Sequence, residues 1–259
     1  MKTTRYPRHV VSKWKKNEVL LQHRTLRSLL PDSMGFSREH LLRMLRKYKM
    51  VYVKPVNGTW GKGVIRVEMD SPSHEEKSYH YHLDTTARSC SSFDELYTAL
   101  CKRKLKKRYL IQQGIDLLQY QNRRFDLRVM VQRTPQKGWK TTGIIGRLAH
   151  PKKIVTNYHN DGKLMPVEKL LAPHLKQTYL PTYLASLENL GEEIAEHLNS
   201  RFPGIRDLGV DVALDQKLRP WILEVNTSPD PYIFRKLKDK SMFRTVMQYA
   251  RANGKLKSR

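Results

Sequence analysis

Apolar positions follow helical spacing in four parts of the chain. The first part is the segment 13–48, in which Ser37 precedes the run REHLLRMLRKY. Ser37 suits an N-cap because a serine hydroxyl accepts a hydrogen bond from the first turn of a helix. Further helices are predicted from about Phe93 to Arg108 behind Ser91 or Ser92, over residues 186–201, and at the basic C-terminal end.

Short apolar or alternating runs predict strands between these helices. They cover residues 50–55, 64–69, 109–114, 124–132 and 141–149, and a hairpin is predicted over about 209–226. Residues 70–90 are polar, and we predict irregular structure there. The elements follow no regular βαβ series, so the chain is predicted to be α+β with mostly antiparallel sheets.

The hairpin at 209–226 carries the most informative chemistry. Its apolar residues pair across the turn as Val210 with Val225, Val212 with Leu223 and Leu214 with Trp221. The other face then places Asp211 opposite Glu224, with Asn226 two residues beyond on the same side. Opposed carboxylates repel unless a cation lies between them, and Mg²⁺ binds oxygen ligands of this kind. The alternative is a solvent-facing strand whose charges are tolerated by water.

A glycine-rich loop follows the apolar strand 50–55. Gly58, Gly61 and Gly63 allow backbone N–H groups to approach phosphate oxygens, although the spacing is not that of a Walker A loop around Lys62. Lys54, at the end of the strand before the loop, can place its ammonium group on a phosphate. The alternatives are a plain hairpin loop and a lysine that extends from the strand end into solvent.

Three charged residues on the predicted strands are further candidates. Asp126 and Arg128 share one face of a strand, and Arg147 lies near the end of the next strand. Arginine suits phosphate because its planar group stays charged and binds in a bidentate manner. The alternative is a surface ion pair between Asp126 and Arg128.

The net charge changes the expected partners. The 259 residues include 49 Lys and Arg against 24 Asp and Glu, which gives +25. Such a charge attracts anionic peptides, polymers and nucleotides, and the run KRKLKKR at 102–108 is the densest basic stretch. The alternative is a generic basic surface without a specific partner. No zinc-finger, helix-turn-helix or RNP signature is found, so nucleic acid is not the expected partner.

Cysteine content and hydropathy indicate the compartment. Only Cys90 and Cys101 occur, without metal-ligand spacing, so neither a disulfide scaffold nor a zinc site is expected. No apolar run is long enough for a transmembrane helix, and the N-terminus lacks the apolar core of a signal peptide. We therefore expect a cytoplasmic protein with no membrane partner.

In this order, the motifs resemble the YheC/YheD family of endospore coat-associated proteins within the ATP-grasp superfamily. The resemblance spans roughly residues 13–250. The segments that carry it are YVKPVNGTWGKGVIRV (52–67), YLIQQGIDL (109–117), RFDLRVMVQ (124–132), GIIGRLA (143–149), VTNYHNDG (155–162), LGVDVAL (208–214) and WILEVNTSPD (221–230).

The resemblance implies an ATP-grasp fold, in which two α+β subdomains grip ATP. It divides the chain into an N-terminal helical segment (1–36), a lid subdomain (37–115) and a C-terminal subdomain with the metal site (116–259). The implied reaction makes an acyl phosphate from a carboxylate and ATP, and an amine then displaces phosphate. The implied cofactors are ATP and Mg²⁺, and the carboxylate and amine substrates stay unidentified.

Roles for individual residues follow from the same resemblance. The nucleotide would be bound by Lys54, Gly58, Gly61, Lys62, Gly63, Gln112, Gln113, Ile115 and Asp116. The first five lie at the phosphates, Gln112, Gln113 and Ile115 lie beside adenine, and Asp116 reaches towards ribose. The implied catalytic residues are Arg128, Arg147 and Asn157. The implied magnesium ligands are Asp211, Glu224 and Asn226.

Two functions stay open at this point. The first is an ATP-dependent carboxylate–amine ligase associated with endospore coat formation, in the mother cell or the coat. The second is a structural coat protein that keeps a nucleotide pocket without turnover. The complete set Asp211, Glu224 and Asn226 favours the enzyme. The second is favoured because only about 50 residues precede Lys54, where many ATP-grasp ligases carry an acceptor-binding domain.

Overall fold

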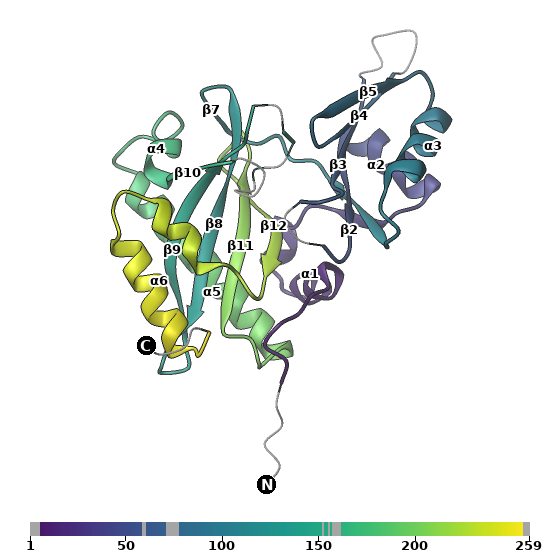
Figure 1. The fold of residues 1–259 in the computed structure, drawn as a ribbon. Coiled ribbons are helices and arrows are strands. Elements are labelled where there is room, and N and C mark those ends of the chain that lie inside the picture. The colour runs from purple at the N-terminus through teal and green to yellow at the C-terminus, as the bar shows by residue number, and fades with distance from the viewer. Residues whose placement is uncertain are drawn as a thin grey trace. The chain divides into compact units, whose positions relative to one another are not determined.

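The computed structural model describes residues 6–58, 61–70, 78–151, 153–154, 156 and 162–255 (Figure 1). The chain forms two compact units. The large unit comprises Met1–Leu30, Leu117–Leu148 and Gly162–Arg259, and the small unit comprises Pro31–Asp116 and Ala149–Asp161. Each unit combines helices with an antiparallel sheet, so the predicted α+β class is confirmed. No helix in the described ranges is long and apolar enough to span a membrane.

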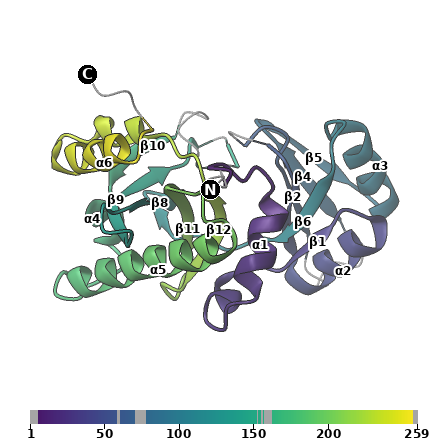
Figure 2. The same cartoon turned by 90° about the horizontal axis from the view of Figure 1, so that it is seen from below.

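The small unit is a sheet with two helices on one face (Figure 2). Its elements are β1 (Ser33–Gly35), α2 (Arg38–Tyr48), β2 (Met50–Pro55), β3 (Ile65–Met69), β4 (Tyr79–Leu83), β5 (Thr86–Cys90), α3 (Phe93–Arg103) and β6 (Tyr109–Gln113). The strand order is β1-β6-β2-β3-β4-β5. Leu41 and Leu45 of α2 and Leu96 of α3 are fully buried against this sheet. The predicted caps form, because the hydroxyls of Ser37 and Ser92 accept backbone hydrogen bonds.

Several predictions of where helices and strands lie in the small unit are wrong. Part of the segment 70–90 forms the hairpin β4–β5, in which Tyr79 and Tyr81 are buried and histidines alternate with them. Tyr and His are both intermediate in how often they are buried, so their alternation along SYHYHLD did not indicate a buried face. Ser33–Gly35 is a strand within a segment predicted to be helical. Helix α3 ends at Arg103, since Lys104 adopts an extended backbone.

The large unit is a sheet covered by helices on both faces (Figures 1 and 2). Its elements are α1 (Lys13–Leu21), η1 (Leu26–Leu29), β7 (Gln119–Tyr120), β8 (Arg123–Arg133), β9 (Trp139–Leu148), β10 (Lys163–Pro166), α4 (Val167–Leu171), α5 (Leu180–Arg201), β11 (Asp207–Leu214), β12 (Pro220–Asn226), η3 (Pro231–Lys236) and α6 (Ser241–Ala252). The strand order is β10-β9-β8-β11-β12, and β7 pairs with β8. Helix α5 starts earlier than the predicted residue 186.

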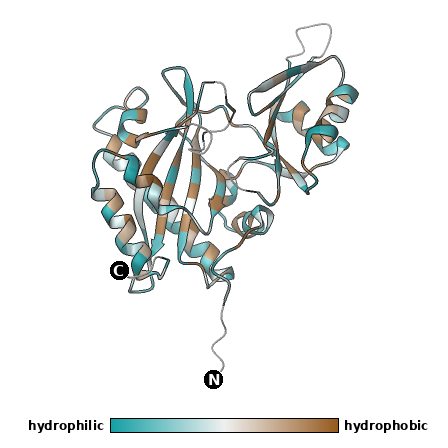
Figure 3. Cartoon of the chain, viewed as in Figure 1, coloured by the Kyte–Doolittle hydropathy of each residue, from teal (hydrophilic) through white to brown (hydrophobic). Residues whose placement is uncertain are grey.

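The two faces of the large sheet differ in what covers them. Hydropathy alternates along its strands because successive side chains point to opposite faces (Figure 3). Val129 and Val210 belong to the main core with Ile194 of α5. On the opposite face, Met130 and Ile145 pack with residues of η3 and α6. The polar residues of this second face form the candidate site.

Candidate functional site

A row of charged residues crosses three strands of the large unit. Arg128 of β8 lies opposite Asp211 of β11, and Asp211 lies opposite Glu224 of β12. Directly paired residues of antiparallel strands share a face, so the three side chains project from the same side of the sheet. The Arg128 Nε donates to Asp211 Oδ1 at 2.6 Å. This places Asp211 and Glu224 together as the sequence predicts.

A second ion pair adjoins the row. Arg147 lies opposite Asp126, and its Nε and Nη2 donate to the two carboxylate oxygens at 2.8 and 2.6 Å. The same Nη2 lies 2.9 Å from Asp211 Oδ2. Asp126 therefore binds Arg147 and does not form the alternative surface ion pair with Arg128. Breaking such a buried pair costs about 3–5 kcal/mol.

Electrostatics keep this network charged. Burial raises the pKa of Asp211, but the positive charges of Arg128 and Arg147 outweigh burial and hold that pKa below its usual value. Burial lowers the pKa of Arg147, but Asp126 and Asp211 raise it overall. Both residues are therefore ionised at neutral pH. Gly209 makes room for the network, since an added Cβ would lie 3.1 Å from Arg128 Nη1 and 2.8 Å from Pro229 Cβ.

The predicted hairpin register holds on one side of a bulge only. Val210 pairs with Val225 and Asp211 with Glu224, as predicted. The register then shifts between Asp211 and Val212, so the other two predicted pairs are wrong. Val212 lies opposite Ile222, Ala213 opposite Trp221 and Leu214 opposite Pro220. The bulge lets Ile222 and Val225, three residues apart, both enter the main core.

Glu224 has a protein cation beside it. Lys13 of α1 places its Nζ 3.1 Å from Glu224 Oε1. Together with Arg128 and Arg147 at Asp211, it neutralises the two opposed carboxylates. The two carboxylates therefore do not require a metal to relieve their repulsion, as the sequence had suggested, because side chains of the protein supply the positive charge.

The donor set still fits Mg²⁺. Asp211 and Glu224 offer carboxylate oxygens on one face, and Asn226 offers an amide oxygen that accepts a hydrogen bond from Ser228 N at 2.9 Å. Hard cations bind such oxygens, and Mg²⁺ commonly needs one or two carboxylates besides phosphate and water. Within the described ranges, no group of three or more His, Cys, Asp and Glu could hold a metal. A magnesium site here would therefore depend on phosphate oxygens as additional ligands.

The small unit brings two predicted nucleotide residues together. Lys54 of β2 donates to the Oε1 of Gln112 on β6 at 2.6 Å. Gln112 is buried and reaches Ser33 Oγ through its Nε2. Gln113 accepts from the backbone N–H of Asp32 at 3.2 Å. Lys54, predicted to bind phosphate, and Gln112, predicted to lie beside adenine, thus share a hydrogen bond.

The other residues predicted to bind the nucleotide lie directly after β6 and in the glycine loop. Ile115 is buried and Asp116 is exposed. In the glycine loop, Gly61 and Gly63 have φ of 71° and 76°, which favour glycine, and Lys62 between them is exposed. Gly58 packs near Pro55. Asn157 lies outside the described residues, so its predicted role has no structural description.

Three residues that hold this site together are not among those predicted from the sequence. Lys13 and Lys16 are buried although they belong to the most basic part of the N-terminal segment. One feature of the sequence does indicate that the two lysines are buried. Lys13 and Lys16 are three residues apart, and Val19 and Leu20 continue the same face of the helix. Gly209 was not predicted to matter because it lies within a strand and not in a turn motif. Its φ is not positive either, so only the space around it requires glycine.

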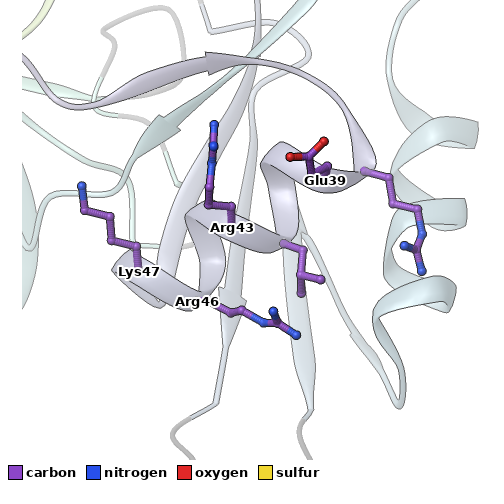
Figure 4. Close-up of a pocket in the computed structure, with 6 residues that line it drawn as sticks. Glu39, Arg43, Arg46 and Lys47 are labelled. Carbon is purple, nitrogen blue, oxygen red and sulfur yellow. The ribbon is translucent and has the colours of Figure 1, made fainter.

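The small unit also presents an open hollow on the outer face of α2 (Figure 4). We call this surface the basic α2 face; it is lined by Arg38, Glu39, Leu42, Arg43, Arg46 and Lys47. Arg38 pairs with Asp94 of α3, and Lys47 pairs with Asp32. Arg43 projects from the middle of the helix and Arg46 from its last turn (Figure 4), and the two supply most of the positive charge of this face that is not in an ion pair given above.

Comparison with known proteins gives the family that the sequence motifs resemble. A family model described as YheC/D like ATP-grasp matches residues 4–252. The endospore coat-associated protein YheC of Bacillus subtilis (strain 168) is 24% identical over 231 residues, which cover 88% of this chain and 62% of that protein. YheD of the same organism, also named endospore coat-associated, is 24% identical over 224 residues, which cover 86% of this chain and 49% of that protein. The chain spans less than two thirds of both relatives.

Proposed function

The chain belongs to the YheC/D-like ATP-grasp family, and we propose from this membership that it binds Mg·ATP and acts as a carboxylate–amine ligase. One structural observation carries the proposal. Arg128, Asp211 and Glu224 form a row across β8, β11 and β12, with Arg147 joined to Asp211. Arginines and oxygen ligands held side by side on rigid strands can bind a metal-complexed phosphate chain.

The proposed roles follow from the positions of the side chains. Arg128 and Arg147 stabilise negative charge on the phosphoryl group during its transfer. Against the effect of burial, Asp126 and Asp211 raise the pKa of Arg147 and so keep it charged. Asp211, Glu224 and Asn226 hold Mg²⁺, which neutralises phosphate charge when it is bound. In the small unit, Lys54, which donates to Gln112, is proposed to bind a phosphate oxygen.

The proposed reaction needs no nucleophilic side chain. A substrate carboxylate attacks the terminal phosphorus of ATP and forms an acyl phosphate with release of ADP. An amine then attacks the acyl carbon and releases inorganic phosphate. The ADP-forming route distinguishes this chemistry from ligases that adenylate the carboxylate and release AMP.

A nucleotide assay tests the proposal. The protein is incubated with Mg·ATP and a panel of amino acids and acidic peptides, and ADP and AMP are measured separately. We expect ADP release that depends on the acceptor and is lost in Asp211→Asn. Release of AMP, or acceptor-dependent release of ADP by Asp211→Asn at the wild-type rate, contradicts the proposal.

A second candidate is a coat-associated protein that binds nucleotide without turnover. Both relatives carry a coat-associated name, and the cations at Asp211 and Glu224 already neutralise the carboxylates that a catalytic metal would need. On this reading, Mg·ATP binds, and no acceptor in the panel releases ADP. The same assay therefore separates the two candidates.

We also propose that an acidic polypeptide is the substrate or partner and that it contacts the basic α2 face. Reversing Arg43 and Arg46 to Glu should abolish salt-sensitive binding of polyglutamate while Mg·ATP affinity stays unchanged. The matched control reverses Lys169 and Lys176, two exposed lysines of the large unit, with the same change in net charge. Equal loss in both variants would mean that net charge alone attracts the polymer.

A further inference from the structure

The loop that follows Asn226 is held by residues from both ends of the chain. It comprises Thr227, Ser228, Pro229 and Asp230, which lie between β12 and η3. Thr227 and Pro229 are buried, whereas Ser228 and Asp230 are exposed. Loops usually run over the surface and are more mobile than the strands they follow. The contacts of the two buried residues therefore decide how firmly this loop is held.

Thr227 is bound by the segment that precedes α1. The backbone N–H of Val10 donates to the Thr227 hydroxyl at 2.8 Å, and this hydroxyl in turn donates to the Val10 carbonyl oxygen at 3.4 Å. Thr227 is only 3% exposed. A buried hydroxyl that both accepts and donates fixes its own side chain, and its removal would take away the acceptor of the Val10 N–H.

Pro229 is bound by Lys255, which follows α6. The ammonium group of Lys255 donates to the Pro229 carbonyl oxygen. Burial lowers the pKa of Lys255, and the carboxylates of Asp207 and Asp230 oppose this shift. The ring of Pro229 lies against Gly209, where an added Cβ would be 2.8 Å from Pro229 Cβ. Pro229 is therefore held through both its carbonyl oxygen and its ring.

Ser228 lies between these two anchored residues and contacts the predicted metal ligand. Its backbone N–H donates to the side-chain oxygen of Asn226 at 2.9 Å. The direction of that oxygen depends on where the Ser228 N–H lies, and Thr227 and Pro229 set the backbone on either side of it. Replacing residues that orient a metal ligand typically weakens metal binding about 10–100-fold.

We propose that Thr227 and Lys255 are positioning residues that hold the side-chain oxygen of Asn226 in the orientation in which it binds Mg²⁺. The inference rests on the proposed function, since it takes Asn226 as a ligand of the metal in Mg·ATP. Thr227 and Lys255 act through the loop and not by contact with the nucleotide. Loss of either anchor should loosen the Ser228 N–H and weaken the metal-dependent part of ATP binding.

The variants each remove one contact. Thr227→Val replaces the hydroxyl by a methyl group, Thr227→Ser retains the hydroxyl, and Lys255→Met removes the ammonium group. Thr141→Val is the matched control for the hydroxyl, because Thr141 is also buried and donates to the Glu188 carbonyl oxygen of α5 at 2.9 Å. Lys238→Met, at an exposed lysine, is the matched control for Lys255→Met.

Amide hydrogen exchange tests the positioning itself, without metal or nucleotide. The Ser228 N–H should exchange about tenfold faster in Thr227→Val and in Lys255→Met than in the wild type, because each variant loses one hydrogen bond of the loop. Thr227→Ser and both control variants should exchange at the wild-type rate. An unchanged rate in either test variant would overturn the role proposed for that residue.

Calorimetry then measures ATP affinity with Mg²⁺ and after chelation of the metal. The ratio of the two affinities should fall about tenfold in Thr227→Val and in Lys255→Met. In an Asn226→Ala background, Thr227→Val should not lower the ratio further, because both changes act on the same ligand. An equal effect of Thr227→Val in both backgrounds would show that Thr227 does not act through Asn226, and would overturn the inference.

Failure of the proposed function gives a different result. In that case the wild type binds ATP equally well with and without Mg²⁺, or does not bind it. The exchange rate of the Ser228 N–H would still decide whether Thr227 and Lys255 position the loop beside Asn226.

Discussion

Replacing Lys16 by Met should stabilise the ligand-free protein at neutral pH. The folded structure lowers the pKa of Lys16 from 10.5 to about 8, chiefly by burial. A shift of that size corresponds to about 3 kcal/mol for keeping the ammonium group charged at pH 7. Met fills a similar volume without charge, but it loses the hydrogen bond to Val10, worth about 1 kcal/mol. The expected gain in the free energy of unfolding is about 1–2 kcal/mol.

The sign of the pH dependence follows from the lowered pKa. Between pH 8 and 10.5 the unfolded chain holds a proton on Lys16 that the folded protein has released. Wild-type stability therefore rises with pH through this window and falls back as pH drops through about 8. The Met variant lacks this group. Its advantage should shrink above pH 8 and reverse near pH 10.5.

Urea unfolding of both proteins at pH 7, 8, 9 and 10 measures the difference directly. Other groups that titrate in this range are common to the two proteins and cancel. Lys15→Met, exposed on the same helix, should stay within about 0.5 kcal/mol of the wild type at each pH. A Met variant that is less stable at pH 7, or a difference that does not vary with pH, would refute the reasoning.

Three further outcomes are expected. Gly209→Ala should lower the free energy of unfolding by about 1–3 kcal/mol in urea titrations, because the new Cβ crowds the Arg128 side chain. Glu224→Gln should lower metal-free stability by a similar amount, since Lys13 loses its carboxylate; an unchanged midpoint would show that the ion pair contributes nothing. Lys54→Met should weaken ATP binding about tenfold in calorimetry while the melting temperature changes little, and unchanged affinity would remove Lys54 from the site.

Patterns within short segments predicted much of the fold because helix caps and strand alternation depend mainly on neighbouring residues. The caps at Ser37 and Ser92 follow from hydroxyls placed before amphipathic runs. The pairing of Asp211 with Glu224 follows from two-residue alternation on both strands. The bulge beyond Asp211 could not be predicted in this way. Several apolar pairings satisfy the same alternation, and contacts with the main core select one of them.

The electrostatic partners were not predictable for a different reason. Asp126 binds Arg147 of the next strand rather than Arg128 of its own strand, and Glu224 binds Lys13 from a helix more than 200 positions earlier. Such pairs depend on which strands neighbour each other and on which helix covers their ends. The strand order and the helix position emerge only in the folded chain.

Calorimetric titration of ATP with and without Mg²⁺ tests the central claim most directly. If Asp211, Glu224 and Asn226 hold Mg²⁺ with the phosphate chain, wild-type protein should bind ATP in the presence of Mg²⁺. Chelation of the metal should weaken this binding at least about tenfold, and Asp211→Asn should reproduce the loss with Mg²⁺ present. Absence of ATP binding with Mg²⁺, or equal affinity with and without the metal, would contradict the account.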